Sequence, residues 1–358
     1  MADEEFVDLR PEGEQEQKKK KKSGCLIFLI VMLSLLLVAL ILVAVGMNYI
    51  FGRLGHFENP EPVEGTIPKM SDEFDVEGNQ EGGENFETVD ASDVVFETVD
   101  VLEGDMINIM LIGQDRRPGE ERARSDSMIL VTINEEKNTI QLTSFMRDLY
   151  VQIPGYMDNR LNAAYRYGGT SLMNETFKVN FGLEIDGNVM VDFDEFTEII
   201  EILGGVTLDI SSAEAKYMNN RKEATKTFKA GTNYFNAEEA LTFTRMRYAA
   251  GGDYGRTDRQ RRVLIAIANS FRDADLVTIF NVIDQVLPHI VTNLTDAQII
   301  EYATKGLTIL GNGGSMDTLR IPQDDAHYNA NIRGMAVLVP NLEACREDLR
   351  EFIYDNEG

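Results

Sequence analysis

Six arginines occupy the stretch from Arg245 to Arg262, in a chain of 358 residues whose formal net charge is −26. The stretch reads RMRYAAGGDYGRTDRQRR and contains no lysine. A guanidinium stays charged and can pair with two phosphate oxygens at once, whereas an ammonium is a more hydrated point charge. The stretch therefore indicates a bound polyanion that must be oriented. The alternative is a solvated, arginine-rich helix face.

The spacing after Gly255 predicts a helix whose first turn faces this ligand. Arg256, Arg259 and Gln260 follow an i, i+3, i+4 pattern and so share one side of the helix. Apolar residues continue along that side, as a helix docked on a sheet requires: Val263, Ile267 and Phe271. A helix N-terminus also offers free N–H groups and a dipole that favours phosphate.

Two aspartates supply oxygen ligands near the first predicted strands. Asp115 follows one strand and Asp126 immediately precedes the next, within GQDRRPGEERARSDSM. A shared strand end would bring their carboxylates together as a site for Mg²⁺ or Mn²⁺. The competing interpretation is that both are loop aspartates that cap turns.

Other catalytic chemistries find little support. The three histidines, His56, His289 and His327, are widely separated, which disfavours a histidine metal site or a Ser-His-Asp triad. The chain has no GxxxxGK[ST] phosphate loop. We expect no nucleic-acid partner, because the chain is acidic and its domain is expected outside the cytoplasm.

The elements that position these residues begin at Met106. Apolar runs predict strands at residues 106–113, 127–134, 139–145, 189–192, 206–210 and 316–321. Periodicity predicts helices at 162–167, 171–181, 195–203, 237–243, 256–271, 296–310 and 342–353. Strands and helices of these lengths predict an α/β fold, an α/β/α sandwich with a mixed central sheet.

The N-terminal part predicts a membrane anchor. Residues 1–22 are polar and end in five lysines, and residues 23–52 carry no charge. About 20 apolar residues suffice to cross a bilayer as a helix. The lysines predict that residues 1–22 lie in the cytoplasm and everything after Gly52 outside, as in a single-pass protein of the cell membrane. A cleaved signal peptide is the alternative, although no small-x-small cleavage pattern follows.

Residues 53–104 read as an acidic linker. The segment from Phe57 to Asp105 contains sixteen acidic residues and a single lysine, Lys69. This composition is typical of a disordered, self-repelling segment. FETVD occurs at Phe86 and again at Phe96, and we expect the second copy to form an edge strand. Residues 105–358 then form the folded domain.

The order of several blocks resembles the LytR-CpsA-Psr family of bacterial cell-envelope proteins. The blocks are NIMLIGQDRR, RSDSM, SFMRDLYVQIPG, NRLNAAYRYGG, VDFDEFTEIIEILGGVTLDI and EEALTFTRMRYAAGGDYGRTDRQRRV. They cover about Asn108 to Ala268. The chain departs from the family pattern at Met146, where many members have proline.

The resemblance implies roles for individual residues. Asp115 and Asp126 would hold the divalent cation, Mg²⁺ or Mn²⁺. The residues expected to bind the pyrophosphate are Arg117, Arg124, Arg147, Arg245, Arg247, Arg256, Arg259 and Gln260. The catalytic group comprises Asp126, Arg124, Arg147, Arg245, Arg247 and Asp253. An apolar tunnel between the sheet and the helices would receive the lipid.

The function that the resemblance implies is phosphotransfer. A glycopolymer, such as teichoic acid or capsule, would move from a polyprenyl pyrophosphate carrier in the membrane to peptidoglycan. Arginine, metal and aspartate suffice for such a reaction, since it depends on positioning and charge neutralisation. Two alternatives remain open. One is a polyprenyl pyrophosphate phosphatase that uses water as acceptor, and the other is a non-catalytic, membrane-anchored envelope regulator.

Overall fold

The computed structural model describes residues 55–56, 86–97, 99–114, 125–246, 252–272, 282 and 284–354. All of them belong to one compact unit, Leu54–Gly358. The predicted cytoplasmic tail and transmembrane segment, residues 1–52, lie outside these ranges. Among the described helices, none combines the length and the apolar character that a membrane span needs.

A seven-stranded sheet forms the centre of this unit, in the order β1-β11-β8-β3-β4-β5-β12. Its strands are β1 (Gly55–His56), β11 (Val291–Thr292), β8 (Gly187–Asp192), β3 (Ile107–Gln114), β4 (Ser125–Asn134), β5 (Thr139–Phe145) and β12 (Ser315–Ile321). Strands β3, β4 and β5 run antiparallel to one another, whereas β8 is parallel to β3 and β12 to β5. The predicted mixed sheet is therefore confirmed.

One face of the sheet packs against α2 (Leu161–Phe181) and α9 (Leu342–Leu349). Burial alternates along β3, so that Met110 and Ile112 join the same core as Phe177 of α2. The Phe145 and Phe177 rings meet edge to face at 4.7 Å. Non-helical backbone angles at Gly168 and Gly169 kink α2. This kink separates the two helical segments that the sequence predicted.

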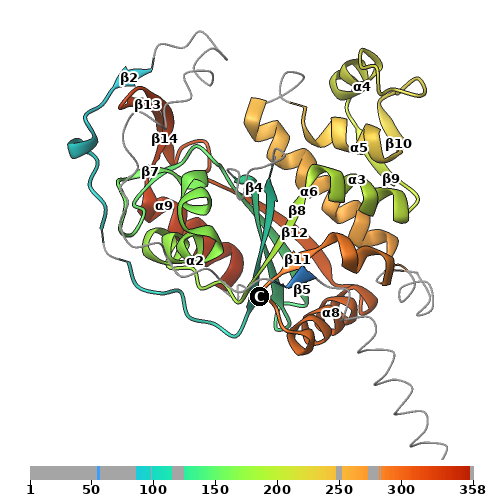
Figure 1. The fold of residues 1–358 in the computed structure, drawn as a ribbon, viewed down its shortest axis with the longest axis horizontal. Helices are drawn as coiled ribbons and strands as arrows, with labels where there is room; N and C mark the ends of the chain where they lie inside the picture. Colours follow the sequence, from blue (N-terminus) through green and yellow to red (C-terminus); the bar gives the residue numbers. More distant parts are fainter. Residues whose placement is uncertain are drawn as a thin grey trace, which may run out of the picture. The chain divides into compact units, whose positions relative to one another are not determined.

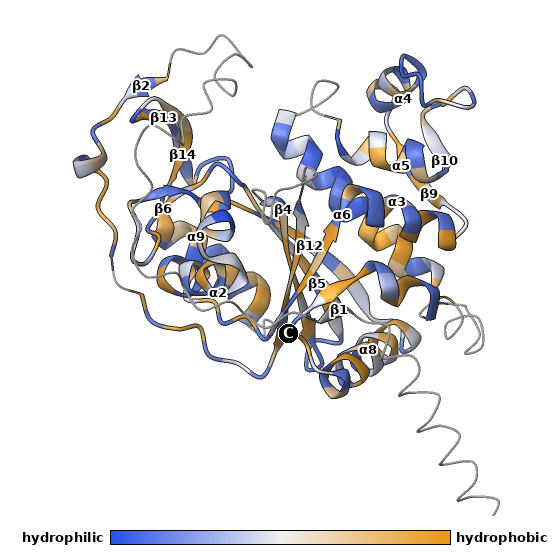
Figure 2. Cartoon of the chain, in the orientation of Figure 1, coloured by the Kyte–Doolittle hydropathy of each residue, from blue (hydrophilic) through white to orange (hydrophobic). Residues whose placement is uncertain are grey.

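The opposite face is covered by α6 (Gly252–Ser270) and α8 (Asp296–Gly311). Helix α6 packs on β5 and β12, and α8 packs on β4 and β5. Figure 1 shows α2 and α9 on one side of the sheet, with α6 and α8 on the other. Figure 2 shows that the first half of α6 is mainly hydrophilic, although the helix lies against the sheet.

A second core lies beside α6. It contains β9 (Val206–Ile210), β10 (Gly231–Phe235), α4 (Ser212–Asn219) and α5 (Ala237–Thr244), with Val263 of α6. Strands β9 and β10 pair antiparallel. Helix α3 (Phe193–Ile202) contacts both β8 and α5. Helices α3 and α6 therefore link this second core to the central sheet.

Shorter elements complete the unit. They are β2 (Glu87–Thr88), η2 (Ala91–Asp93), β6 (Tyr150–Val151), β7 (Asn159–Arg160), η3 (Leu287–His289), β13 (His327–Ile332), β14 (Met335–Pro340) and η4 (Arg350–Tyr354). A small sheet has the order β14-β13-β2. Strand β2 pairs parallel to β13.

The folded unit includes chain that precedes the predicted boundary at Asp105. Four apolar side chains of the acidic stretch pack against the core of this small sheet: Val89, Ala91, Val94 and Phe96. Burying these side chains ties residues 86–97 to the domain despite their acidic neighbours. The edge strand forms in the first FETVD copy and not, as we expected, in the second, whose Phe96 ring lies 6.2 Å from that of Tyr150.

Glu239 of α5 generates a prediction about stability. Its buried carboxylate accepts a hydrogen bond from Lys226 Nζ at 2.6 Å and others from the backbone of Thr225 and Asn236. Burial raises the pKa of Glu239, but the hydrogen bonds from Lys226 and the backbone outweigh it and hold the pKa below its ordinary value. The charged form therefore stabilises the fold above the unfolded-state pKa, and this contribution is lost as the pH falls through the folded-state pKa.

We expect Glu239→Gln to lower the free energy of unfolding by about 1–3 kcal/mol at pH 7, since charged and backbone donors lose their ionic acceptor. Urea unfolding at several pH values measures this. The difference from wild type should shrink below about pH 4, where unfolded glutamate is protonated. Glu238→Gln, at the exposed neighbouring position, is the control and should change little. Equal losses in both variants, or a pH-independent loss, would contradict the assignment.

Candidate active site

Three strand ends meet at one edge of the central sheet. Gln114 at the end of β3 pairs with Ser125 at the start of β4 and with Asp192 at the end of β8. Asp126 follows Ser125 at this edge. Residues 115–124, between β3 and β4 in the sequence, lie outside the described structure, and the predicted residues Asp115, Arg117 and Arg124 are among them. Arg247 also lies outside it.

Arg147, two residues past β5, is the centre of the site. Its Nη1 donates to Asp126 Oδ1 at 2.7 Å, and its Nε lies 3.5 Å from Asp253 Oδ2. The Nε atom also lies 3.5 Å from Asp148 Oδ2. The structure therefore brings together three residues that the sequence placed in the site, although they come from β4, the end of β5 and α6. We call Asp126, Arg147, Asp148, Asp253 and Arg256 the arginine–aspartate cluster.

Neighbouring carboxylates keep the guanidinium of Arg147 protonated. Burial lowers the pKa of Arg147, but the carboxylates of Asp148, Asp126 and Asp253 outweigh burial and raise the pKa above its ordinary value. Arg160 shares the carboxylate of Asp148, with Nε 3.5 Å from Oδ1. Arginine and aspartate charges therefore nearly balance, and Arg147 stays cationic.

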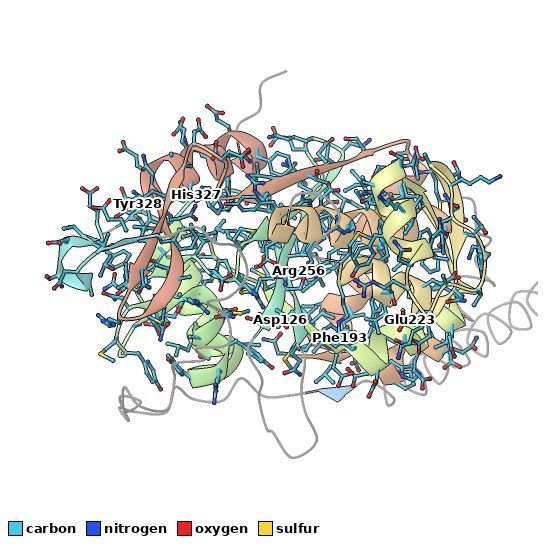
Figure 3. All side chains as sticks on the ribbon, turned by 90° about the horizontal axis from the view of Figure 1, so that it is seen from above. Asp126, Phe193, Glu223, Arg256, His327 and Tyr328 are labelled. Carbon is cyan, nitrogen blue, oxygen red and sulfur yellow. The ribbon has the colours of Figure 1, made fainter. Side chains whose placement is uncertain are left out.

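The first turn of α6 completes the cluster. Arg256 Nη2 lies 3.2 Å from Asp253 Oδ2. The helix begins at Gly252, four residues before the predicted start, so Asp253 lies in the first turn, where a carboxylate is favoured by the helix dipole. Gln260 Oε1 accepts a hydrogen bond from Ser127 Oγ at 3.0 Å, which ties α6 to β4 beside Asp126. Figure 3 shows Arg256 and Asp126 in the middle of the molecule.

Arg245 and Arg259, which the sequence predicted to bind the pyrophosphate, have contacts outside the arginine–aspartate cluster. The Arg245 guanidinium lies 4.3 Å above the ring of Phe193, which directly follows β8 at the same sheet edge. Arg245 caps the C-terminus of α5 in a helical conformation. Arg259, at 1% side-chain exposure, donates to the Met246 carbonyl and lies 3.6 Å from Glu214.

Arg259 therefore contacts the second core. Burial lowers its pKa, and Glu214 opposes that effect. Because Glu214 lies on α4, these contacts direct the guanidinium away from Asp126, although Arg259 is only one turn from Arg256 along the helix. A direct role for Arg259 at the pyrophosphate stays a prediction.

Sequence reasoning missed three residues of this region: Asp148, Ser127 and Phe193. Asp148 could have been identified from the sequence, because it directly follows Arg147. Phe193 could also have been identified, since it follows the strand predicted at 189–192. Ser127 could not, because its partner Gln260 lies 133 positions away.

The described residues fit a divalent cation only in part. No group of three or more His, Cys, Asp or Glu side chains that could hold a metal occurs among them. Asp126 engages Arg147 through Oδ1, and its side chain is 29% exposed. Mg²⁺ is commonly held by one or two carboxylates together with substrate phosphates and water. The donor set is therefore compatible with a metal that the substrate helps to bind.

Fold and cluster together define a class, a mixed-sheet α/β protein with a cluster of paired arginines and aspartates at its strand ends. The chain belongs to the LytR_cpsA_psr family, whose sequence model matches residues 72–351. The family resemblance seen in the sequence blocks is therefore confirmed.

Named relatives and solved structures are similar to this chain over most of its length. The chain is 30% identical over 231 residues to the polyisoprenyl-teichoic acid–peptidoglycan teichoic acid transferase TagU of Bacillus cereus, covering 64% of this chain and 72% of that one. The crystal structure of Bacillus subtilis TagV aligns at a TM-score of 0.57 and 28% identity, covering 70% of this chain and 98% of that one. TagT with bound octaprenyl pyrophosphate lipid, at 22% identity and a TM-score of 0.54, shares the fold over 72% of this chain and 97% of that one.

The contact between Ser127 and Gln260 can be tested by a double-mutant cycle. Ser127→Ala and Gln260→Ala should each destabilise the domain, and the double variant should lose less than the sum. The expected coupling is about 0.5–1.5 kcal/mol, as for a typical hydrogen bond. Denaturant unfolding of the four proteins measures it. Ser315→Ala, at the far end of β12, paired with Gln260→Ala is the control and should be additive.

Proposed function

We propose that this chain transfers a glycopolymer from a polyprenyl pyrophosphate carrier to peptidoglycan. The observation that carries the proposal is Arg147, held cationic by carboxylates from three elements at the sheet edge. The relatives named above include a teichoic acid transferase that is 30% identical. Teichoic acid is accordingly the polymer class we propose first, with capsule as a second.

The residues of the site divide the work of phosphoryl transfer. Arg147, Arg256 and the exposed Arg245 neutralise the pyrophosphate oxygens as charge moves to the leaving group. A hydroxyl oxygen of the acceptor sugar bonds to the phosphorus that carries the polymer, and the bond from that phosphorus to polyprenyl phosphate breaks. The hydroxyl proton passes to an aspartate, either Asp253 or another carboxylate that holds no metal.

A divalent cation, Mg²⁺ or Mn²⁺, is part of the proposal. Asp126, with Asp115 from the neighbouring loop, would hold it. When bound, such an ion polarises phosphoryl oxygens and stabilises the developing charge. The ion pair with Arg147 fixes the carboxylate of Asp126, so that Oδ2 keeps a constant position.

The same proposal places the enzyme at the membrane. Residues 23–52 are uncharged and follow five lysines, which supports a single anchor with the catalytic domain outside the cytoplasm. An anchored domain meets its lipid-linked substrate in the membrane and its acceptor in the wall.

Arg147→Gln tests the function. With purified chain, polyprenyl-pyrophosphate-linked polymer and peptidoglycan, we expect the rate of polymer-linked muropeptide formation to fall about 10²–10³-fold, the usual loss of a preorganised charge donor. Arg346→Gln, on α9, is the matched control and should retain activity. Release of inorganic phosphate without linkage to muropeptide would identify a phosphatase instead. Full function of a folded Arg147→Gln protein would favour a regulator.

Asp126→Asn tests the metal. We expect Mg²⁺ to raise the melting temperature of wild type in the presence of a polyprenyl pyrophosphate analogue, and chelator to reverse the effect. The variant should need at least tenfold more Mg²⁺ for the same shift, because it has lost an anionic ligand. Asp317→Asn on β12 is the control for charge. An identical Mg²⁺ response in Asp126→Asn would remove this residue from the metal site.

A further inference from the structure

Arg261 differs from its neighbours on α6. Gln260 accepts from Ser127, and Arg262 contacts Glu214 through Nη1 at 2.8 Å. Arg261 is equally polar, yet its side chain is only 8% exposed. Its Nε and Nη1 atoms are buried and have no hydrogen-bond partner. Its nearest carboxylate, Asp258, lies 3.8 Å from Nη2, beyond hydrogen-bond distance.

Helix geometry shows where Arg261 lies. Each residue advances about 100° around an α-helix. Arg259 and Val263 face the second core and Gln260 faces β4, so Arg261 continues the turn past β4, toward β5 and β12. Helix α6 packs on both of these strands. Arg261 therefore lies between the helix and this part of the sheet.

Arg320 of β12 is the charged residue of the sheet on this side. It pairs in register with Ser144 of β5, so both side chains leave the same face. The Ser144 hydroxyl is buried and has no hydrogen-bond partner. Arg320 donates to the Pro322 carbonyl, pairs with Asp324 and stacks on the Tyr254 ring at 4.0 Å. Its carboxylate partner Asp324 is 84% exposed and so lies on the solvent side.

These contacts leave buried guanidinium N–H donors of Arg261 under α6 without an acceptor among the described residues, because the carboxylates of Asp258 and Asp324 lie toward solvent, 50% and 84% exposed. Burial lowers the pKa of Arg261, Asp258 raises it and Arg320 lowers it further. A buried cation with free N–H donors destabilises a fold unless an anion approaches it. Ser144 adds one more unused donor on the same side. Two arginines and a hydroxyl form a donor set that suits a tetrahedral oxyanion.

We propose that Arg261, Arg320 and Ser144 form a second binding site, for a phosphoryl group. Arg261 lies eight residues along α6 from Asp253, a rise of about 12 Å at 1.5 Å per residue, whereas Arg320 stacks on Tyr254, the neighbour of Asp253. The ligand of this second site is a phosphodiester of a polymer or a free phosphate, which share the same oxyanion chemistry. The proposal does not depend on the transfer reaction.

Thermal melting of the purified full-length chain across a titration of inorganic phosphate tests the site, against chloride at equal ionic strength. A second arm uses a glycerol phosphate oligomer as the phosphodiester. The variants are Arg261→Leu, Arg261→Gln and Arg147→Gln, with Arg346→Leu as the control for charge. Because Arg261 has buried N–H donors without an acceptor, we expect Arg261→Leu to melt at or above the wild-type temperature without phosphate.

The apparent dissociation constant for at least one probe should rise tenfold or more in both Arg261 variants. It should change less than twofold in Arg147→Gln and Arg346→Leu. Binding of the oligomer alone would assign the site to polymer, and binding of inorganic phosphate alone to the free ion. No response in wild type, equal responses in all variants, or loss only in Arg147→Gln would overturn the proposal. Destabilisation of both Arg261 variants without phosphate would also overturn the proposal, since it would show that Arg261 has a structural partner.

The test also separates this site from the transfer reaction. If transferase activity were absent but the phosphate response were intact, the proposal of this site would still hold.

Discussion

The ion pairs of Arg147 are the constraint on which the site depends. Three carboxylates converge on one guanidinium, from β4, from the turn after β5 and from the first turn of α6. Each carboxylate alone would repel the others, and the central cation makes their proximity favourable. Removing Arg147 would therefore leave negative charges crowded at the sheet edge. The cluster is at once a binding device and the tie that fixes α6 to the end of the sheet.

Helix α6 has to satisfy three environments at once. Its first turn meets the cluster through Asp253, its middle contacts β4 through Gln260, and its outer side meets α4 through Arg259 and Arg262. A helix with so many buried polar positions gains little from apolar burial over that stretch, and its position is set by hydrogen bonds and ion pairs. This explains why the first half of the helix is hydrophilic although it packs on the sheet (Figure 2).

The parts of the fold that follow from local pattern were predictable from sequence. Strands β3, β4 and β5 appear within two residues of their predicted bounds, because buried strands leave short apolar runs that are visible in the sequence. The earlier start of α6 was not predictable, because Gly252 and Gly255 suggest a loop and the ion pairs of Asp253 are long-range. The contact from Ser127 to Gln260 depends on tertiary packing alone. Asp115, Arg117, Arg124 and Arg247 remain predictions.

The arginines of one stretch have different contacts. The composition of the stretch from Arg245 to Arg262 indicated one anion site, yet its arginines serve different ends. Arg256 belongs to the cluster, and Arg262 holds Glu214, which also caps α4. Arginine suits both roles, since its planar fork can reach two acceptors in a buried site where a lysine would satisfy one. A run of one residue type therefore predicts a concentration of charge. Which of those charges meets a ligand follows from the contacts of each side chain, and Arg261 is the member with two buried nitrogens that have no acceptor among the described residues.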